Sequence, residues 1–583
     1  MKNQRLELTW LNKDKTYHPE PRLLIEDTNL SYGDADTENM LIHGDNLLAL
    51  KALEQDYAGK VKCIYIDPPF NTGAAFEHYD DGVEHSIWLN LMRIRLEILH
   101  RLLSDDGVIF VHIDDKEMDY LKIVMDEIFR RENFLNRITI KTSDPSGHKT
   151  VNPSPYSQTE YVLMYSKNRR KYIYEQMYVA SEYDTGYSKI IPNVDQPYSE
   201  WVAFGLNQYY AEKLGFKNTR KAKKAIGALE FDAQVARFAL KNNEKVFQAT
   251  AISSKAGRDT VELRDKSKAN PDVVYLQERD DYDDIYILNG RQIYFYSSKV
   301  REIEGSITPA KPLTNLWTDI PYNGIASEGG VKFKNGKKPE KLIRRVIELT
   351  TNPNDLVLDS FLGSGTTAAV AHKMGRRYIG VELGDHARTH CQPRLRRVVD
   401  GEQGGISQAV NWQGGGGFKF YTLAPSLLKR DDHGFYVIDE SYHPDQLAAA
   451  MAKHQNFTYQ PDADVYWKQG YSTENHFIFT TTQPVTVELV DRIGRQLGAE
   501  ESVLICCKSH DEAARTRHPR VEVEKIPNVL LGRCTFGRDD YSLNIIDLPN
   551  ERPEPEPLLQ VTTEKKPTEE KTTTNQGQQS LFE

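Results

Sequence analysis

The sequence predicts an α/β fold built on a doubly wound, mostly parallel sheet. Short apolar strands alternate with amphipathic helices along residues 61–130, which is typical of parallel strands joined by helices on both faces. Far along the chain, the apolar strand 356–359 runs into a glycine turn and then into a helix that begins at Thr366. A strand, a tight glycine turn and a helix form the nucleotide-binding unit of Rossmann-like sheets. We therefore expect a Rossmann-like sheet.

Composition places the chain among soluble proteins with several domains. Its 583 residues suggest roughly two to four domains, and no apolar run approaches the ~18 residues of a membrane span. None of its five cysteines has metal-ligand spacing, and the N-terminus does not look like a signal peptide. We expect a cytoplasmic protein with no membrane contact. The net charge of −10 means that any contact with nucleic acid would need local basic patches.

The N-terminal segments lead up to the first strands. Residues 1–40 are polar and interrupted, and we expect them to form an arm laid over the core. A short strand then ends in Gly44-Asp45, and a helix is expected over 46–55. Asp45 could therefore serve as a helix cap.

The strand 61–66 ends abruptly at Asp67-Pro68-Pro69-Phe70. The two prolines fix φ and lack N–H donors, so the strand cannot continue. A carboxylate, a free carbonyl and an aromatic ring are thus presented at the carboxyl end of a strand, where ligands bind in open α/β sheets. Taken alone, the motif could also be an ordinary strand-to-turn junction.

The alternation continues after the prolines. Apolar residues at helical spacing predict a helix over 87–102, followed by a buried strand at 108–113 and a helix over 116–130. A strand over 159–165 is expected at the edge of the sheet, in a hairpin.

Residues 176–315 interrupt this rhythm. Residues 213–258 contain eleven Lys and Arg residues and only three acidic ones, so this segment carries a net charge of +8 inside an acidic protein. Asn289-Gly290 predicts a hairpin over 285–296. A run of charges is usually a solvated helix face, and the basic segment alone does not specify a partner.

The alternation returns after residue 315. Lys338-Pro339 precedes a predicted helix, because proline is favoured near the first helical turn. The strand 377–382 ends in Glu382, 23 positions after Asp359, which is the usual place of a carboxylate that binds ribose hydroxyls. The glycine pattern by itself would fit nicotinamide or flavin dinucleotides equally well.

The C-terminal third divides into three parts. Residues 401–417 end in four consecutive glycines and predict a flexible linker. An α/β interaction domain is expected over 418–548, with a strand, a helix and a strand at 476–481, 485–497 and 502–507. Residues 549–583 are rich in Pro, Glu, Lys and Thr and predict a disordered tail.

Together, Asp67-Pro68-Pro69-Phe70 and the segment 359–367 resemble the amino-methyltransferases of DNA that use S-adenosylmethionine. Their order along the chain is similar to the permuted β group. Residues 66–73 and 359–367 resemble, more closely, the modification subunit of type III restriction–modification systems. The resemblance implies a methyltransferase core split into a catalytic half, 41–175, and a cofactor half, 316–400. It also implies that the insertion 176–315 is a target-recognition domain.

The resemblance further implies roles for individual residues, with the N6 amine of a flipped-out adenine as the methyl acceptor. No metal is expected, because the sulfonium of the cofactor already activates the methyl group. The implied catalytic residues are Asp67, Pro68, Pro69 and Phe70. The implied cofactor-binding residues are Asp45, Lys338, Pro339, Asp359, Phe361, Gly363, Gly365, Thr366 and Glu382. The implied DNA-binding residues are Lys213, Lys217, Arg220, Lys221, Lys223 and Lys224.

Other interpretations remain open at the level of sequence. Aspartate rather than serine before Pro-Pro favours the N6 amine of adenine over the N4 amine of cytosine, because this is the usual pairing in the family. Enzymes that methylate glutamine in proteins carry Asn-Pro-Pro and lack a basic insertion of this kind. A dinucleotide oxidoreductase would not need Asp67-Pro68-Pro69-Phe70. A DNA-recognition module with a silent catalytic core is a further alternative.

Partners are implied partly by motifs that the chain lacks. It has no phosphate-binding loop of the Gly-x-x-x-x-Gly-Lys-Ser/Thr type, so we expect a separate ATP-dependent helicase and nuclease subunit to carry out restriction. The family suggests a homodimer acting on double-stranded DNA. Near the C-terminus, Gln578, Leu581 and Phe582 resemble the short peptide by which bacterial proteins dock on the replication sliding clamp.

Overall fold

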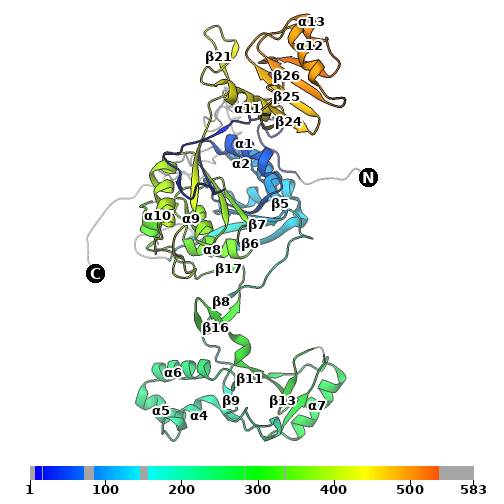
Figure 1. Cartoon of the computed structure of the whole chain (residues 1–583). Coiled ribbons are helices and arrows are strands. Elements are labelled where there is room, and N and C mark those ends of the chain that lie inside the picture. Colours follow the sequence, from blue (N-terminus) through cyan, green and yellow to red (C-terminus); the bar gives the residue numbers. More distant parts are fainter. Residues whose placement is uncertain are drawn as a thin grey trace, which may run out of the picture.

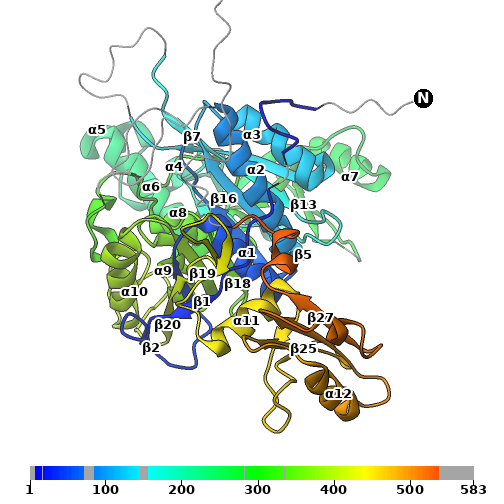
Figure 2. The ribbon, with the colours of Figure 1, turned by 90° about the horizontal axis from the view of Figure 1, so that it is seen from above.

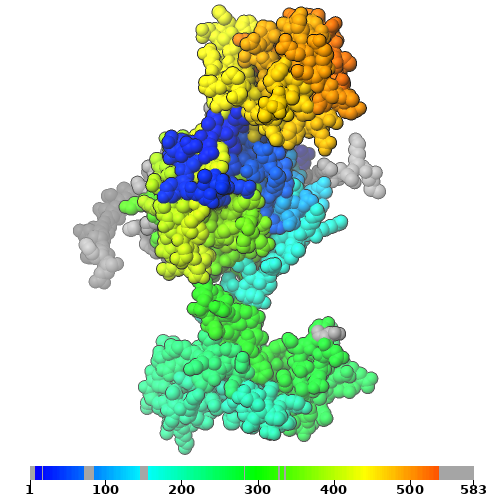
Figure 3. Space-filling model, in the orientation of Figure 1, coloured from blue at the N-terminus to red at the C-terminus, as the bar shows by residue number. Residues whose placement is uncertain are grey.

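The computed structural model describes residues 7–15, 17–70, 85–144, 155–280, 282–333 and 336–536. A central domain carries an insertion at one end and a C-terminal domain at the other (Figure 1). A narrow neck joins the insertion to the central domain in the space-filling view (Figure 3). Within the described residues, no helix is long and apolar enough to cross a membrane.

The central domain is built on an 11-stranded, mostly parallel sheet, which confirms the predicted fold class. The strands lie in the order β1 (Leu24–Glu26), β20 (Gly417–Leu423), β3 (Met40–His43), β19 (Arg377–Glu382), β18 (Leu356–Asp359), β4 (Val61–Ile66), β5 (Leu103–Ile113), β7 (Thr159–Ser166), β6 (Phe134–Lys141) and β17 (Leu316–Trp317). The short strand β2 (Tyr32–Gly33) pairs with β20. The β4 strand lies beside β18, with Leu358 opposite Ile64, so two segments almost 300 residues apart end at the same edge.

Helices cover both faces of this sheet. One face packs against α1 (Asn46–Tyr57), α2 (His85–Leu102) and α3 (Met118–Met125). The other packs against α8 (Glu340–Glu348), α9 (Thr366–Lys373) and α10 (Gln392–Val399). Seen from above, α2 and α3 lie on the opposite side of the strands from α9 and α10 (Figure 2). The helix predicted over 87–102 is confirmed as α2; of its predicted apolar stripe, Leu91, Ile98 and Leu102 are buried, whereas Ile87 and Ile94 are half-buried.

One strand differs from its predicted position in the sheet. The strand expected at the edge, β7, lies between β5 and β6 and runs antiparallel to both. It does form the predicted hairpin, with β6. The edge beyond β6 is covered by β17, which pairs Leu316 with Thr139. A local pattern cannot show this, because β17 reaches the edge only after the whole insertion has passed.

The glycine-rich segment is packed against the central domain, which differs from the flexible linker that was predicted. Gly415 has φ +105° and its carbonyl oxygen lies 2.8 Å from His372 Nε2. At Gly417 an added Cβ would lie 2.3 Å from a main-chain atom of Asp34. These glycines therefore permit close approach and left-handed turns. The strand that follows, β20, belongs to the central sheet and pairs with β3 and the N-terminal β1.

The insertion has two sheets. A three-stranded sheet next to the central domain contains β15 (Val300–Ile303), β16 (Ser306–Pro312) and β8 (Tyr178–Ala180). A six-stranded sheet contains β10 (Phe204–Gly205), β9 (Lys189–Ile190), β11 (Val246–Ala251), β14 (Arg291–Phe295), β13 (Ile285–Leu288) and β12 (Val274–Gln277). Its helices are α4 (Leu206–Lys213), α5 (Thr219–Ile226), α6 (Ala228–Lys241) and α7 (Arg258–Ala269). The hairpin predicted at Asn289-Gly290 is confirmed, with positive φ at both residues.

The C-terminal domain is α/β. Its main sheet has the order β23 (Thr458–Tyr459), β24 (Gly470–Thr473), β25 (His476–Thr481), β26 (Ser502–Cys507) and β27 (Val521–Lys525). The helices include α11 (Pro444–His454) and α12 (Val487–Gln496), and β21 (Leu428–Arg430) pairs with β22 (Tyr436–Ile438). The predicted strands 476–481 and 502–507 are confirmed as β25 and β26.

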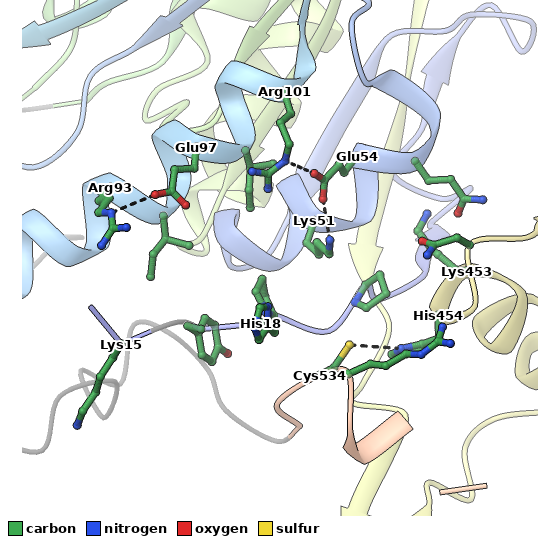
Figure 4. Close-up of a pocket in the computed structure, with 18 of the residues that line it drawn as sticks. Lys15, His18, Lys51, Glu54, Arg93, Glu97, Arg101, Lys453, His454 and Cys534 are labelled. Carbon is green, nitrogen blue, oxygen red and sulfur yellow. Dashed lines mark hydrogen bonds and ion pairs between the residues drawn. The ribbon is translucent and has the colours of Figure 1, made fainter. Parts of the chain in front are cut away.

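The C-terminal domain is attached to α1 beside a cavity of about 570 Å³ (Figure 4). Gln55 Nε2 donates a hydrogen bond to the Phe457 carbonyl oxygen (2.9 Å). Basic side chains from α1, α2 and α11 line the cavity, and Lys51 and Arg101 share the carboxylate of Glu54. Burial, followed by the charges of nearby lysines, lowers the pKa of His454 to about 3. The junction between the two domains is therefore rich in basic side chains, several of which are paired with Glu54 or Glu97.

Candidate active site

Asp67 stands at the end of β4, where the two prolines turn the chain out of the sheet. Pro68 is buried, and the indole Nε1 of Trp88 donates a hydrogen bond to the Pro69 carbonyl oxygen (2.7 Å). Among the described residues, no donor hydrogen-bonds to the carbonyl oxygen of Pro68. The turn is thus held by α2, and no described residue occupies the Pro68 carbonyl oxygen at the strand end.

Lys338, which precedes α8, reaches this strand end. Its Nζ lies 3.3 Å from Asp67 Oδ1 and 3.0 Å from Glu160 Oε2. Burial raises the pKa of Asp67 above its ordinary value, and the Lys338 ammonium opposes this shift. The resemblance assigned Lys338 to the cofactor, whereas the structure places its side chain on the carboxylate of the Asp67-Pro68-Pro69-Phe70 motif.

Two further side chains, His112 and Tyr65, extend the cluster around Lys338 and Glu160. His112 Nε2 lies 2.6 Å from Glu160 Oε2, and the Tyr65 hydroxyl lies 2.8 Å from His112 Nδ1. Burial alone would raise the pKa of Glu160, but Lys338 and His112 outweigh it and hold that pKa well below its usual range.

Sequence reasoning missed His112 and Glu160, although strand direction could have indicated them. His112 lies near the carboxyl end of β5, which is parallel to β4. Glu160 lies at the start of β7, which is antiparallel to β5. Both side chains therefore come to the edge of the sheet where Asp67 lies.

Phe70 belongs to the same cluster. Its ring is half-buried and stacks on the His112 ring, with centroids 6.0 Å apart and an interplanar angle of 26°. The ammonium of Lys338 lies 4.8 Å from the centre of the Phe70 ring. The ring is therefore held by a stacking contact and a cation–π contact.

Asp359, at the end of the neighbouring β18, organises the glycine turn. Its Oδ1 accepts from the main-chain N–H of Phe361 (2.9 Å), and its Oδ2 accepts from the Thr367 hydroxyl (2.6 Å). Burial raises the pKa of Asp359 to about 7, and the charges of Asp67 and Glu382 add to the shift. This carboxyl group holds the strand end to the first turn of α9.

Glu382, at the end of β19, is tied to the same loop. Its Oε2 accepts from the main-chain N–H of Gly363 (2.6 Å), and its Oε1 accepts from that of Gly384 (3.1 Å). His386 Nε2 lies 2.8 Å from Oε1. The structure thus brings Glu382 to the predicted place and shows it supporting the loop; binding to ribose stays a prediction.

The two glycines of the turn serve different purposes. Gly363 has φ +57°, and an added Cβ would contact nothing closer than the Phe361 carbonyl oxygen at 4.0 Å. Gly365 has φ +81°, and an added Cβ would lie 3.3 Å from Cys391 Cα. The loop is therefore open at Gly363 and closely packed at Gly365.

Two other residues assigned to the cofactor have structural partners. Asp45 Oδ1 accepts from the main-chain N–H groups of Leu47 and Leu48 (2.8 and 3.1 Å), so it caps α1. Arg394 Nη1 donates to the Thr366 hydroxyl (2.7 Å). Pro339 precedes the first residue of α8, as predicted.

The six basic residues assigned to DNA binding lie on and around α4 and α5, on the part of the insertion that faces away from the central domain (Figure 1). Lys223 forms an ion pair with Asp232 (2.8 Å), and the Lys213 ammonium lies 4.9 Å from the centre of the Phe238 ring. The remaining four are exposed and form no ion pair with another described residue: Lys217, Arg220, Lys221 and Lys224. These four leave an uncompensated positive surface. Gln578, Leu581 and Phe582 lie outside the described residues.

Comparison with known proteins agrees with this arrangement. The family model described as "DNA methylase" matches residues 61–392, which span β4 to the start of α10. The chain is 40% identical to the probable type III restriction-modification enzyme HindVI Mod subunit of Haemophilus influenzae over 427 residues, covering 67% of this chain and 54% of that protein.

More distant relatives carry similar names. The EcoPI Mod subunit of Escherichia phage P1 is 28% identical, over 64% of this chain and 62% of that protein. The EcoP15I Mod subunit of Escherichia coli is 24% identical, over 76% of this chain and 75% of that protein. The chain spans less than two thirds of the length of the HindVI and EcoPI subunits. The family match covers more than half of the chain and includes both strand ends of the site; the chain belongs to the DNA methylase family.

Proposed function

We propose that the chain transfers a methyl group from S-adenosylmethionine to the N6 amine of adenine in DNA. The observation that carries this proposal is the meeting of two strand ends: Asp67-Pro68 follows β4, and the open glycine turn follows its neighbour β18. In open α/β sheets, ligands bind outside the carboxyl ends of such strands. The choice of adenine over cytosine N4 rests on the aspartate before the prolines.

The residues around the glycine turn fit an adenosyl cofactor. Gly363 leaves room for a ligand against the main chain, and α9 begins directly after the turn. Glu382 and Asp359 are the acidic groups at the two adjoining strand ends, and Glu382 would hold ribose hydroxyls there. When bound, the cofactor supplies a methyl group that its positively charged sulfur activates, so no metal is required.

The Asp67 turn would act on the amine that receives the methyl group. The lone pair of an exocyclic amine is delocalised into the ring, so the nitrogen must be drawn toward tetrahedral geometry. The Asp67 carboxylate and the Pro68 carbonyl oxygen would each accept a hydrogen bond from one of the two N–H groups of the amine, and both acceptors are preorganised. Phe70 would stack on the base, which contributes about 1–3 kcal/mol. The base must leave the duplex, at a cost of a few kcal/mol, to reach these groups.

We further propose that the chain is the modification subunit of a type III-like restriction–modification system. The similarity to the HindVI, EcoPI and EcoP15I Mod subunits supports this assignment. The exposed cations around α5 would contact DNA phosphates, and a separate ATP-dependent subunit would carry out restriction. A homodimer is part of the same proposal.

Transfer of a labelled methyl group to plasmid DNA tests the activity. The wild-type chain should label DNA, and Asp67→Ala should lose nearly all transfer while it keeps cofactor and DNA binding, because Asp67 acts in the transition state. Asp36→Ala, at an exposed residue remote from the site, is the matched control. Single-molecule sequencing of the product separates N6-methyladenine from N4-methylcytosine. DNA binding without any transfer by the wild type would instead favour a recognition module with a silent core.

A further inference from the structure

Lys338 places a buried positive charge between two carboxylates at the sheet edge. Its side chain is only 8% exposed, and its Nζ contacts both Asp67 Oδ1 (3.3 Å) and Glu160 Oε2 (3.0 Å). Both carboxylates hold the pKa of Lys338 above its ordinary value even though burial opposes this. The ammonium is therefore a permanent part of the site.

The role proposed for Asp67 requires an ionised carboxylate. An ionised carboxylate only accepts hydrogen bonds, whereas a protonated one carries an O–H donor that would face the N–H of the substrate. Burial favours the protonated form of Asp67. A nearby positive charge is needed to oppose this, and Lys338 supplies it.

We propose that Lys338 is a positioning residue that keeps the Asp67 carboxylate ionised and oriented for the substrate amine. This inference rests on the proposed methyl transfer. Glu160 and His112 hold the ammonium in place, because Glu160 Oε2 contacts both Lys338 Nζ and His112 Nε2 (2.6 Å). The Tyr65 hydroxyl in turn holds His112 through Nδ1 (2.8 Å).

Several titratable groups surround Asp67, and some favour its ionisation while others oppose it. They are Tyr65 on β4, His112 on β5, Glu160 on β7, Asp359 on β18, Tyr322 in the segment before α8, and Lys338. Burial raises the pKa values of both tyrosines far above their usual range, so they stay neutral. Without Lys338, Asp67 would face the acidic groups Glu160 and Asp359 with no permanent positive charge in this set.

Two substitutions should move the ionisation of Asp67 in opposite directions. Lys338→Met removes the positive charge, so the pKa of Asp67 rises and the acid limb of the kcat profile moves to higher pH by about 1–3 units. Glu160→Gln removes a negative charge, so the pKa of Asp67 falls and the acid limb moves to lower pH. General damage to the fold would not give shifts of opposite sign.

Steady-state kinetics across the pH range in which each variant stays folded tests the proposal. Lys338→Arg keeps the charge and should return the acid limb toward its wild-type position. Lys341→Met is the matched control, since Lys341 lies in the first turn of α8 with its side chain 40% exposed. KM for S-adenosylmethionine should stay unchanged in all variants. An unmoved acid limb in Lys338→Met, or a raised KM for the cofactor, would overturn the proposal; the latter would return Lys338 to the cofactor site.

A stability measurement tests the same contact without methyl transfer. In Lys338→Met, the folded-state pKa of Asp67 lies further above its unfolded-state value. The stability deficit of this variant should therefore be small at acidic pH and should grow as pH rises through the folded-state pKa. Adding Asp67→Asn should reduce that growth. If the wild-type chain transfers no methyl group, the proposed function fails, while this comparison still decides whether Lys338 stabilises the charge of Asp67; equal growth in both variants would refute that.

Discussion

The four exposed cations around α5 predict how salt should weaken the binding of DNA. Each Lys or Arg that neutralises a phosphate contributes about 0.9 to the slope of log affinity against log salt concentration. Lys221 and Lys224 are exposed and form no ion pair with a described residue, so Lys221→Ala with Lys224→Ala should reduce the slope by about 1.8. Adding Lys223→Ala should reduce the slope by less than a further ~0.9, because Lys223 is already paired with Asp232.

This prediction has a direct measurement. Fluorescence anisotropy of a labelled DNA duplex, at salt concentrations from about 50 to about 200 mM, should show wild-type affinity falling about tenfold more than that of the double variant. Lys60→Ala with Lys525→Ala is the matched control, because both lysines are exposed and lie outside the insertion. A slope that does not change in the double variant, or that changes equally in the control, would place the DNA contact elsewhere.

Two further predictions concern the buried ion cluster and the C-terminus. Arg394→Met should destabilise the fold by about 3–5 kcal/mol in urea unfolding, because it breaks a fully buried ion pair with Glu340. Arg388→Met should cost less than about 1 kcal/mol, because the side chain of Arg388 is 40% exposed. A labelled peptide of residues 572–583 should bind purified sliding clamp in fluorescence polarisation, since Leu581 and Phe582 would anchor it in an apolar pocket. Binding that survives alanine at both anchors would contradict the clamp hypothesis.

Much of the central fold was predictable because its signals are local. Apolar spacing alone indicated the helix α2. Asn289-Gly290 indicated a hairpin, because only a few residue types adopt positive φ at low cost. The Asp67-Pro68-Pro69-Phe70 motif and the glycine turn of 363–365 can likewise be recognised from their residue types. Each combines residues whose backbone restrictions are intrinsic, so no tertiary contact is needed to recognise them.

The boundary after residue 400 shows where such signals fail. Four consecutive glycines predicted a flexible linker, yet they lie in tight turns against Val399, His372 and the N-terminal arm. The strand β20 then joins β3, more than 370 residues away. Glycine permits both flexibility and close packing, and the surrounding structure decides between them.

The sequence by itself indicated the residues of the candidate site: the carboxylate, the prolines and the glycine turn. Only the tertiary structure decided what surrounds them. Lys338 lies 178 positions from Glu160 and further still from Asp67. It meets both because β4 and β5 end, and the antiparallel β7 begins, at one edge of the sheet beside α8. A buried charge must find partners in a low-dielectric interior, and such partners are chosen by proximity in space and by strand direction, which no local pattern records.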